Sequence, residues 1–466
     1  MRHRGFKLWS RALALTMTSL LLAGSAMGGG ISILEYSARD LGTSFAGGAA
    51  LADEASTIAK NPAGLTRLQQ PEAQANLHTI FIQADFKDEG STNAVGSPMI
   101  GTEDDGGTDV FVPSLFASMP VSDRLVFGLG IHSPYGLATD YDDDWVGRYH
   151  ATSSELITLN FNPSVGYKIL DWLSLGLGLS AQYIDADLQN EVDFGLTAGR
   201  VAGSEPAAQM LSQNLDGSCK VTGDDWGYGF NVGVLLEPTD QTRFGIHFRS
   251  QIKHDISGDS DFEKVPTADD LAPLGPGAGP IAAGLAANFN DPDVDSDITL
   301  PATLSFSAYH EFNEQWAIMA DATWTDYSQL DELRVEFEND LPDNVTTLDW
   351  EDTWRLSVGL NFKPTSNLVL RCGAAYDESP VPNKEARTPR VPDDDRIWAS
   401  IGLGYTWFDR LTVDIGYSHL FIGDIDIEKT TSGNLQEFDE NCPRGNLVGE
   451  FDASADIVGL EVRYVF

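Results

Sequence analysis

The 466-residue sequence is poor in cysteine, in cationic side chains and in long apolar runs. Its three cysteines are too few for a disulfide framework. Only 29 lysines and arginines face 70 aspartates and glutamates, so the chain lacks the basic surface that nucleic-acid binding needs. No segment after residue 28 has the roughly 18 consecutive apolar residues of a transmembrane helix. These absences exclude nucleic acid as a partner and a helical membrane protein as the fold.

Residues 1–28 have the organisation of a secretory signal peptide. Ala12 to Ala23 is an apolar stretch shorter than the roughly 20 residues of a spanning helix, and it follows a basic start. Ala26, Met27 and Gly28 place small residues at the two positions that a signal peptidase inspects. The alternative is a short membrane anchor. Cleavage is the expectation, and the segment is left out of the fold.

Strict alternation of apolar and small polar residues is the main signal in the rest of the chain. Within 172–183 one face is leucine-rich, whereas the other is Ser174, Gly176, Gly178 and Ser180. Segments 226–236 and 397–407 repeat this pattern. A period of two belongs to strands. A soluble sandwich also alternates, but its strands are usually about 5–6 residues long.

Longer alternating runs, small residues on the hidden face and aromatic residues at both ends favour a barrel that spans a membrane. The last strand ends in Phe466, which resembles the terminal signature that the barrel-assembly machinery recognises. The expected fold is therefore all-β, a transmembrane antiparallel β-barrel in the bacterial outer membrane, with lipid and lipopolysaccharide as its surroundings. Fourteen strands are expected, near 74–87, 109–120, 124–135, 153–168, 172–187, 225–237, 242–256, 299–312, 315–334, 346–363, 367–378, 395–408, 411–429 and 453–466.

The connections between these strands alternate between short and long. The short turns are expected to face the periplasm, and the longest loops, near 188–224 and 257–298, to face outward. Residues 206–215 of the first loop are compatible with a short helix. Leu271, Leu274 and Leu285 make the second loop unusually apolar. They either pack on one another or receive a hydrophobic ligand, and composition leaves both readings open.

The segment 29–72 precedes the barrel strands (73–466) and is not strand-like. It is rich in Gly, Ala and Ser, with a helical stretch near 50–59. It most economically fills the lumen as a plug, and the alternative is a periplasmic tail.

Several stretches of the chain, in order, carry a family resemblance. They are Ile33–Ser37, Leu41-Gly42, Ala52–Thr57, Asn61-Pro62-Ala63-Gly64, Ser133–Thr139, Tyr376–Pro382 and Pro392–Arg396. Together they resemble the FadL family of outer-membrane transporters of long-chain fatty acids and other hydrophobic compounds. The resemblance implies a 14-stranded barrel closed by an N-terminal hatch, with Asn61, Pro62, Ala63 and Gly64 as the hatch motif.

The resemblance also implies a path for the ligand. It leads from an outer groove between two loops into an inner pocket, and out sideways at an inward kink of the third strand. The kink falls at Ser133, Pro134, Tyr135 and Gly136, where Pro134 removes a ladder donor. The N-terminal residues Ile31 and Ile33 are expected to reach the pocket.

The sequence departs from the family at the residues that would hold a carboxylate. The family's basic positions align near Asn190 and Glu351, which cannot pair with an anion. Lumen-side arginines do exist. Arg249, Arg355 and Arg371 are candidates, and their alternative role is to pair with lumen carboxylates.

No pattern for chemistry stands out. The sequence has no Walker motif, no G-x-S-x-G and no H-E-x-x-H, so an enzyme and a cofactor are not expected. The sequence indicates passive uptake of hydrophobic small molecules, and the alternatives are a structural or adhesive barrel and a lipid hydrolase. A Cys219–Cys442 disulfide is left open, and the acidic loop clusters are interpreted as solvated charge rather than cation sites.

Overall fold

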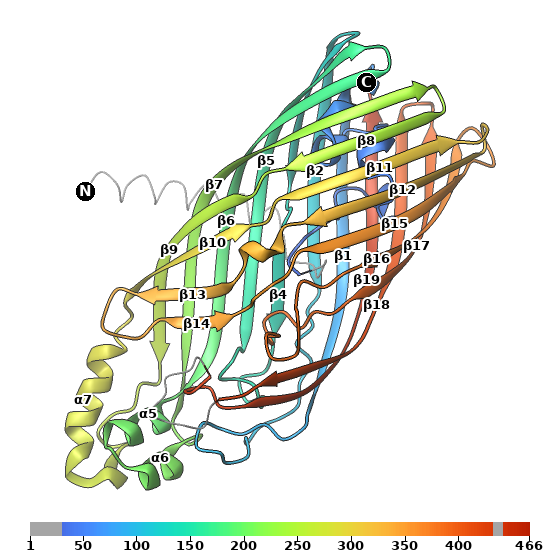
Figure 1. Cartoon of the computed structure of the whole chain (residues 1–466). Coiled ribbons are helices and arrows are strands. Elements are labelled where there is room, and N and C mark those ends of the chain that lie inside the picture. The colour runs from blue at the N-terminus through green and yellow to red at the C-terminus, as the bar shows by residue number, and fades with distance from the viewer. Residues whose placement is uncertain (1–29, 432–440) are drawn as a thin grey trace, which may run out of the picture.

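The computed structural model describes residues 30–431 and 441–466, so the predicted signal peptide, residues 1–28, lies outside the described residues. Strands form one antiparallel sheet that closes where β1 (Glu72–Asp88) pairs with β19 (Leu447–Val465). Figure 1 shows the wall as a tilted barrel. The nine continuous wall strands of the described chain are β1, β2 (Val110–Ser122), β5 (Ser153–Leu170), β6 (Leu173–Asp193), β7 (Asp216–Thr239), β16 (Leu368–Asp377), β17 (Arg396–Trp407), β18 (Leu411–Lys429) and β19.

Five further wall strands are interrupted. They are β3 (Leu125–His132) with β4 (Gly136–Asp140), β8 (Thr242–Arg249) with β9 (Ile252–Glu263), β10 (Asp293–Leu300) with β11 (Thr303–Glu311), β12 (Trp316–Thr325) with β13 (Glu332–Phe337), and β14 (Asn344–Thr347) with β15 (Thr353–Phe362). Between β12 and β13 lies the short η3 (Tyr327–Gln329). With the nine continuous strands they make fourteen, so the predicted 14-stranded antiparallel barrel is confirmed.

The two faces of the wall differ as the alternation predicts. On β6, Leu175, Leu177 and Leu179 are exposed on the outside, whereas Ser174 and Ser180 are buried inside. The outer face offers apolar side chains to lipid, and the inner face offers small residues to whatever fills the lumen. No helix of the described residues is long and apolar enough to cross a membrane.

The strands run further at the long-loop end than the alternation indicated. β6 continues to Asp193 and β7 begins at Asp216, while β9 reaches Glu263 and β10 begins at Asp293. The expected loops 188–224 and 257–298 thus shrink to 194–215 and 264–292. Toward this end the outward positions of β6 become polar, as at Asp185 and Asp187, whereas Ala186 and Leu188 face the interior. Backbone pairing therefore persists although the outward apolar pattern stops. The shortened loops fold into α5 (Phe194–Val201), α6 (Glu205–Leu211), η2 (Ala272–Gly277) and α7 (Ala278–Asn288).

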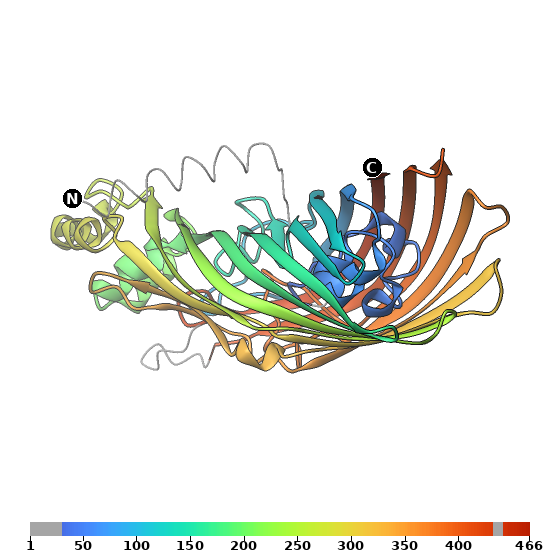
Figure 2. The ribbon, with the colours of Figure 1, turned by 90° about the horizontal axis from the view of Figure 1, so that it is seen from above.

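Residues 30–71, called here the N-terminal segment, lie inside the barrel. Figure 2 shows this segment, in blue, enclosed by the wall strands. Its elements are α2 (Ala38–Leu41), α3 (Gly48–Leu51), α4 (Thr57–Lys60) and η1 (Pro62–Arg67). The single helical stretch expected near 50–59 is wrong. Ala52 has a left-handed φ of 49°, which ends α3, and α4 starts anew at Thr57.

Candidate functional site

The third wall strand is interrupted at the predicted kink. β3 pairs with β5 as far as His132 opposite Asn160, and pairing resumes in β4 at Gly136 opposite Ile157. Three residues, Ser133 to Tyr135, therefore stand opposite two on β5, which is a bulge. The hydroxyl of Thr158 compensates for the broken ladder. It donates to the carbonyl of Tyr135 at 2.5 Å and accepts from its N–H at 3.1 Å.

The bulge separates two neighbouring strands of the wall. β2 pairs with β3 only from Leu115 opposite Ile131 onward. Within residues 30–431 and 441–466, β4 has ladder pairing with β5 and none with β2. The wall is thus unpaired between residues 110–114 of β2 and the strand β4.

The N-terminal segment occupies this unpaired region. The N–H of Ile33 donates to the carbonyl of Pro134 at 3.0 Å, and the N–H of Gly136 donates to the carbonyl of Ile31 at 2.9 Å. The Ile33 side chain is 1% exposed and packs in one apolar cluster with Val112 of β2 and Ala138 of β4. The kinked strand has therefore exchanged β2 for the N-terminal segment as its partner.

The motif Asn61 to Gly64 anchors the segment to the wall strand β7. The Asn61 amide donates to the carbonyls of Ala49 at 2.7 Å and Val234 at 3.0 Å, and its oxygen accepts from the N–H of Ala63 at 3.0 Å. Gly233 of β7 has to be glycine here, because a Cβ on it would lie 1.8 Å from the Asn61 oxygen. The glycine-rich lumen face thus lets the N-terminal segment approach the wall closely.

Replacing Asn61 by alanine should loosen the N-terminal segment and leave the barrel folded. Three hydrogen bonds are lost, at about 0.5–1.5 kcal/mol each. Amide hydrogen exchange in residues 48–67 should rise, and single-channel conductance in planar bilayers should increase. Asn361→Ala, which removes a buried lumen asparagine of β15, is the matched control. Unchanged exchange and conductance in the Asn61 variant would contradict the anchoring role.

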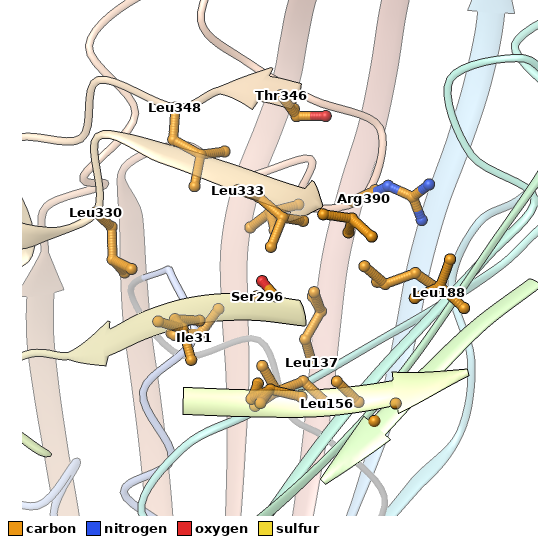
Figure 3. Close-up of a pocket in the computed structure, with 18 of the residues that line it drawn as sticks. Ile31, Leu137, Leu156, Leu188, Ser296, Leu330, Leu333, Thr346, Leu348 and Arg390 are labelled. Carbon is orange, nitrogen blue, oxygen red and sulfur yellow. The ribbon is translucent and has the colours of Figure 1, made fainter. Parts of the chain in front are cut away.

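An apolar cavity lies beside the kink. It contains about 920 Å³ of unfilled space, part of it open to solvent. Ile31 of the N-terminal segment and Leu137 of β4 contribute to its wall, together with side chains of the interrupted strands and their connections. Figure 3 shows the labelled leucines Leu137, Leu156, Leu188, Leu330, Leu333 and Leu348 around it. One cavity therefore borders both the kink and the N-terminal segment.

Arg390, from the connection between β16 and β17, is the cation that lines this cavity (Figure 3). It is buried, and its Nη1 donates to the carbonyl of Ser153 at 3.0 Å and to the Ser154 hydroxyl at 2.8 Å. Its Nη2 lies 3.5 Å from the amide oxygen of Asn190. Burial, and next the charge of Arg444, lower the pKa of Arg390 to about 9. It has no ion pair with a carboxylate of the described residues.

The structure places the three predicted arginines away from this cavity. Arg371 pairs with Asp414 at 2.6 Å, and Arg355 lies 3.8 Å from Asp377. Both therefore have the alternative role considered for them, as partners of lumen carboxylates. Arg249 faces a second cavity and has no such partner among the described residues. Glu351 is exposed, whereas Asn190 lies beside Arg390.

The apolar loop residues pack mainly on one another. Leu271 and Leu285 are buried with Ala198 of α5 and Leu211 of α6, and Leu274 packs against this cluster. None of the three leucines lines the cavity beside the kink or the second cavity that Arg249 faces. Cys219 and Cys442 are free thiols, so the structure shows no disulfide between them. Within the described ranges, no group of three His, Cys, Asp or Glu side chains could hold a metal ion.

Sequence reasoning missed Arg390 as a candidate. Arg390 lies outside every alternating segment, so its odd or even position could not indicate whether its side chain faces the lumen. The signal available was its position just before Pro392–Arg396, one of the stretches that carry the family resemblance.

Comparison with known proteins places this architecture in a family. The family model described as "Outer membrane protein transport protein (OMPP1/FadL/TodX)" matches residues 19–466. A protein of Escherichia coli O6:H1 named long-chain fatty acid transport protein is 29% identical over 459 residues, covering 97% of this chain and 98% of the relative.

Two solved structures share the fold. A FadL homologue of Pseudomonas aeruginosa has a TM-score of 0.82 at 24% identity, covering 94% of this chain and 100% of that one. The toluene transporter TbuX of Ralstonia pickettii has a TM-score of 0.61 at 17% identity, covering 90% and 96%. The predictions of an outer-membrane location and of a transporter rather than an enzyme are confirmed by the family. This chain belongs to the FadL/TodX family of outer-membrane transport proteins.

Proposed function

We propose that this chain carries long-chain fatty acids and other hydrophobic molecules passively across the outer membrane. The path runs from the long-loop end into the apolar cavity and leaves the barrel between β2 and β4. The observation that carries the proposal is that Ile31 both lines the cavity, together with Leu137, and accepts a hydrogen bond from the N–H of Gly136 at the kink. Displacement of the N-terminal segment would join the cavity to the unpaired part of the wall.

The energetics of the cavity suit an alkyl chain with or without an acidic headgroup. Each buried methylene contributes about 0.8 kcal/mol of transfer free energy, so an uncharged hydrocarbon needs no polar contact. An ionised carboxylate buried without a partner would cost several kcal/mol, and Arg390 offers that partner. The names of the relatives, which refer to fatty acid and toluene, support a broad range of hydrophobic ligands.

Family membership and the lumen-filling segment together support gated diffusion. The N-terminal segment acts as the hatch in this proposal, the barrel comprises the residues after it, and the short turns face the periplasm. Contacts with membrane lipid, lipopolysaccharide and the barrel-assembly machinery remain predictions from the outward apolar face and the terminal Phe466.

Flux through the purified protein tests the proposal. Vesicles that contain only this chain and a soluble lipid-binding acceptor should take up labelled laurate, methyl laurate and dodecane without an energy source. Empty vesicles and vesicles with an unrelated 14-stranded porin are the controls. Strict dependence on an energised inner membrane, or release of free acid from methyl laurate, would contradict passive transport. The second result would favour a lipid hydrolase, and binding without any flux would favour a structural barrel.

A further inference from the structure

A second cavity lies across the N-terminal segment from the first. It contains about 860 Å³ of unfilled space, part of it open to solvent. Ile31 borders the first cavity, whereas Ser32, Leu34 and Tyr36 border the second. One extended stretch of chain therefore lies between the two. The second cavity is more polar, since threonines and charged side chains of the lumen face contribute to it.

Arg249, at the end of β8, has unused hydrogen-bonding capacity toward this cavity. Its Nη1 donates to the Tyr36 hydroxyl at 3.1 Å and its Nη2 to the Tyr135 hydroxyl at 3.0 Å. Its Nε is buried without a hydrogen-bond partner. A guanidinium has five N–H donors in a planar fork, so donors remain for one further acceptor, and a carboxylate fits that fork.

Arg249 differs from the other cations of the second cavity, which have carboxylate partners. Arg355 lies 3.8 Å from Asp377, and Lys60 pairs with Asp40 and Glu54. In the described part of the chain, Arg249 forms no ion pair with Asp or Glu. The acidic Asp321 of the same cavity accepts hydrogen bonds from Ser307 and Thr323 instead. Arg249 is half-buried with its Nε withdrawn from solvent, and a partly desolvated cation without a counterion favours an incoming anion.

We propose that Arg249 anchors a second binding site, which takes the ionised carboxylate headgroup of an amphipathic ligand. Leu34, Phe45 and Ala59, which also line the cavity, would contact the alkyl chain. The site adjoins the kink through Tyr135, whose hydroxyl donates to the carbonyl of Pro301 at 2.5 Å while it accepts from Arg249. A carboxylate that leaves Arg390 would thus find a second cation beside the kink. The inference rests on the proposed function, because it requires that such ligands enter the lumen.

Carbon-13 NMR of carboxyl-labelled laurate on the detergent-solubilised full chain tests the site. Two bound carboxylate resonances are expected. One should disappear in Arg249→Gln and persist in Arg390→Met, and the other should show the reverse pattern. Arg243→Gln is the matched control. Arg243 is a buried arginine of the same strand and face, it contacts the carbonyl of Ala50, and it does not line the cavity.

The double variant Tyr36→Phe/Tyr135→Phe distinguishes anion binding by Arg249 from a purely structural role of this side chain. This variant removes the hydroxyls that Arg249 contacts and keeps the cation, so both resonances should remain. Laurate flux in Arg249→Gln should fall at least about tenfold while dodecane flux changes less than about twofold. Loss of both fluxes together would overturn the site as an anion binder.

A measurement on the unaltered protein covers the case in which Arg249→Gln does not fold. Laurate with a diazirine next to its carboxyl should label Tyr36, Tyr135 or His247 on illumination. Labelling confined to the first cavity, or a single bound resonance that depends on Arg390, would overturn this site and leave the proposed function intact. Absence of any bound laurate and of laurate flux would contradict the uptake of fatty acids itself.

Discussion

Replacing Pro134 and Gly136 together by valine should reduce dodecane flux by about a hundredfold or more, with the barrel still folded. Valine supplies the N–H that proline lacks and favours the extended backbone, so β4 could continue the ladder and pair with β2. A hundredfold change corresponds to about 2.7 kcal/mol, within reach of the several ladder hydrogen bonds that would form. Flux into vesicles and heat-modifiable gel migration measure transport and folding separately.

Pro163→Val is the matched control for the kink. Pro163 lies in β5 opposite Leu129, where the ladder with β3 is continuous, so flux should stay within about twofold. Dodecane binding in the first cavity should also survive in the double variant, because the lining residues are unchanged. Normal flux through a folded Pro134/Gly136 variant would show that the ligand does not leave between β2 and β4.

Arg390→Met should weaken laurate binding by about 10–100-fold and leave dodecane binding unchanged or slightly tighter. A hydrogen bond to a charged group contributes about 1.5–3 kcal/mol, which gives that range. Methyl laurate should behave like dodecane, because its headgroup carries no charge. Competition binding to the purified protein measures all three ligands. Arg387→Met, which removes a buried arginine of the same connection that is paired with Asp394, is the control.

The pH dependence of the Arg390→Met effect gives a second test of Arg390. Although burial lowers the pKa of Arg390, the guanidinium is charged at neutral and acidic pH. The laurate carboxylate takes up a proton below about pH 4 and then no longer needs a cation. The difference in laurate affinity between the unaltered protein and Arg390→Met should therefore be present at pH 7 and shrink below about pH 4. A difference that is the same at both pH values, or one that dodecane shares, would contradict an ionic contact at Arg390.

The sequence predicted the barrel well within the membrane and poorly beyond it. In β6 the outward apolar pattern ends after Tyr183, yet the backbone pairing runs on to Asp193. Beyond that point the outward side chains Asp185 and Asp187 are polar and the inward ones, Ala186 and Leu188, are apolar, so the pattern that marks a lipid-facing strand is lost. The N-terminal helices were mispredicted for a related reason. Ala52 has a left-handed φ and lies close to Gly64, a tertiary contact that helix propensity cannot reveal.

The candidate site was predictable only in part. Pro134 and Gly136 mark the kink in the sequence, and Ile31 was expected at the pocket. Two features could not be inferred. One is the exchange of β2 for Ile31–Ile33 as the partner of the kinked strand, and the other is the position of Arg390 beside Asn190. Both features join segments more than 90 residues apart in the sequence. The alternation along a strand predicts which face a side chain lies on, but it does not predict which distant residues become its neighbours.

The two backbone hydrogen bonds between Ile31–Ile33 and the kink are relevant to membrane permeability. They concern how an outer membrane can admit hydrophobic molecules and still exclude ions and polar solutes. Releasing them is a local event of a few kcal/mol, which fits fluctuations on the microsecond-to-millisecond scale. The other strands of the wall need not separate, and Asn61 keeps the rest of the lumen filled meanwhile. On the proposed path, a hydrophobe would then pass into lipid while ions and water-soluble toxins would find no continuous aqueous route.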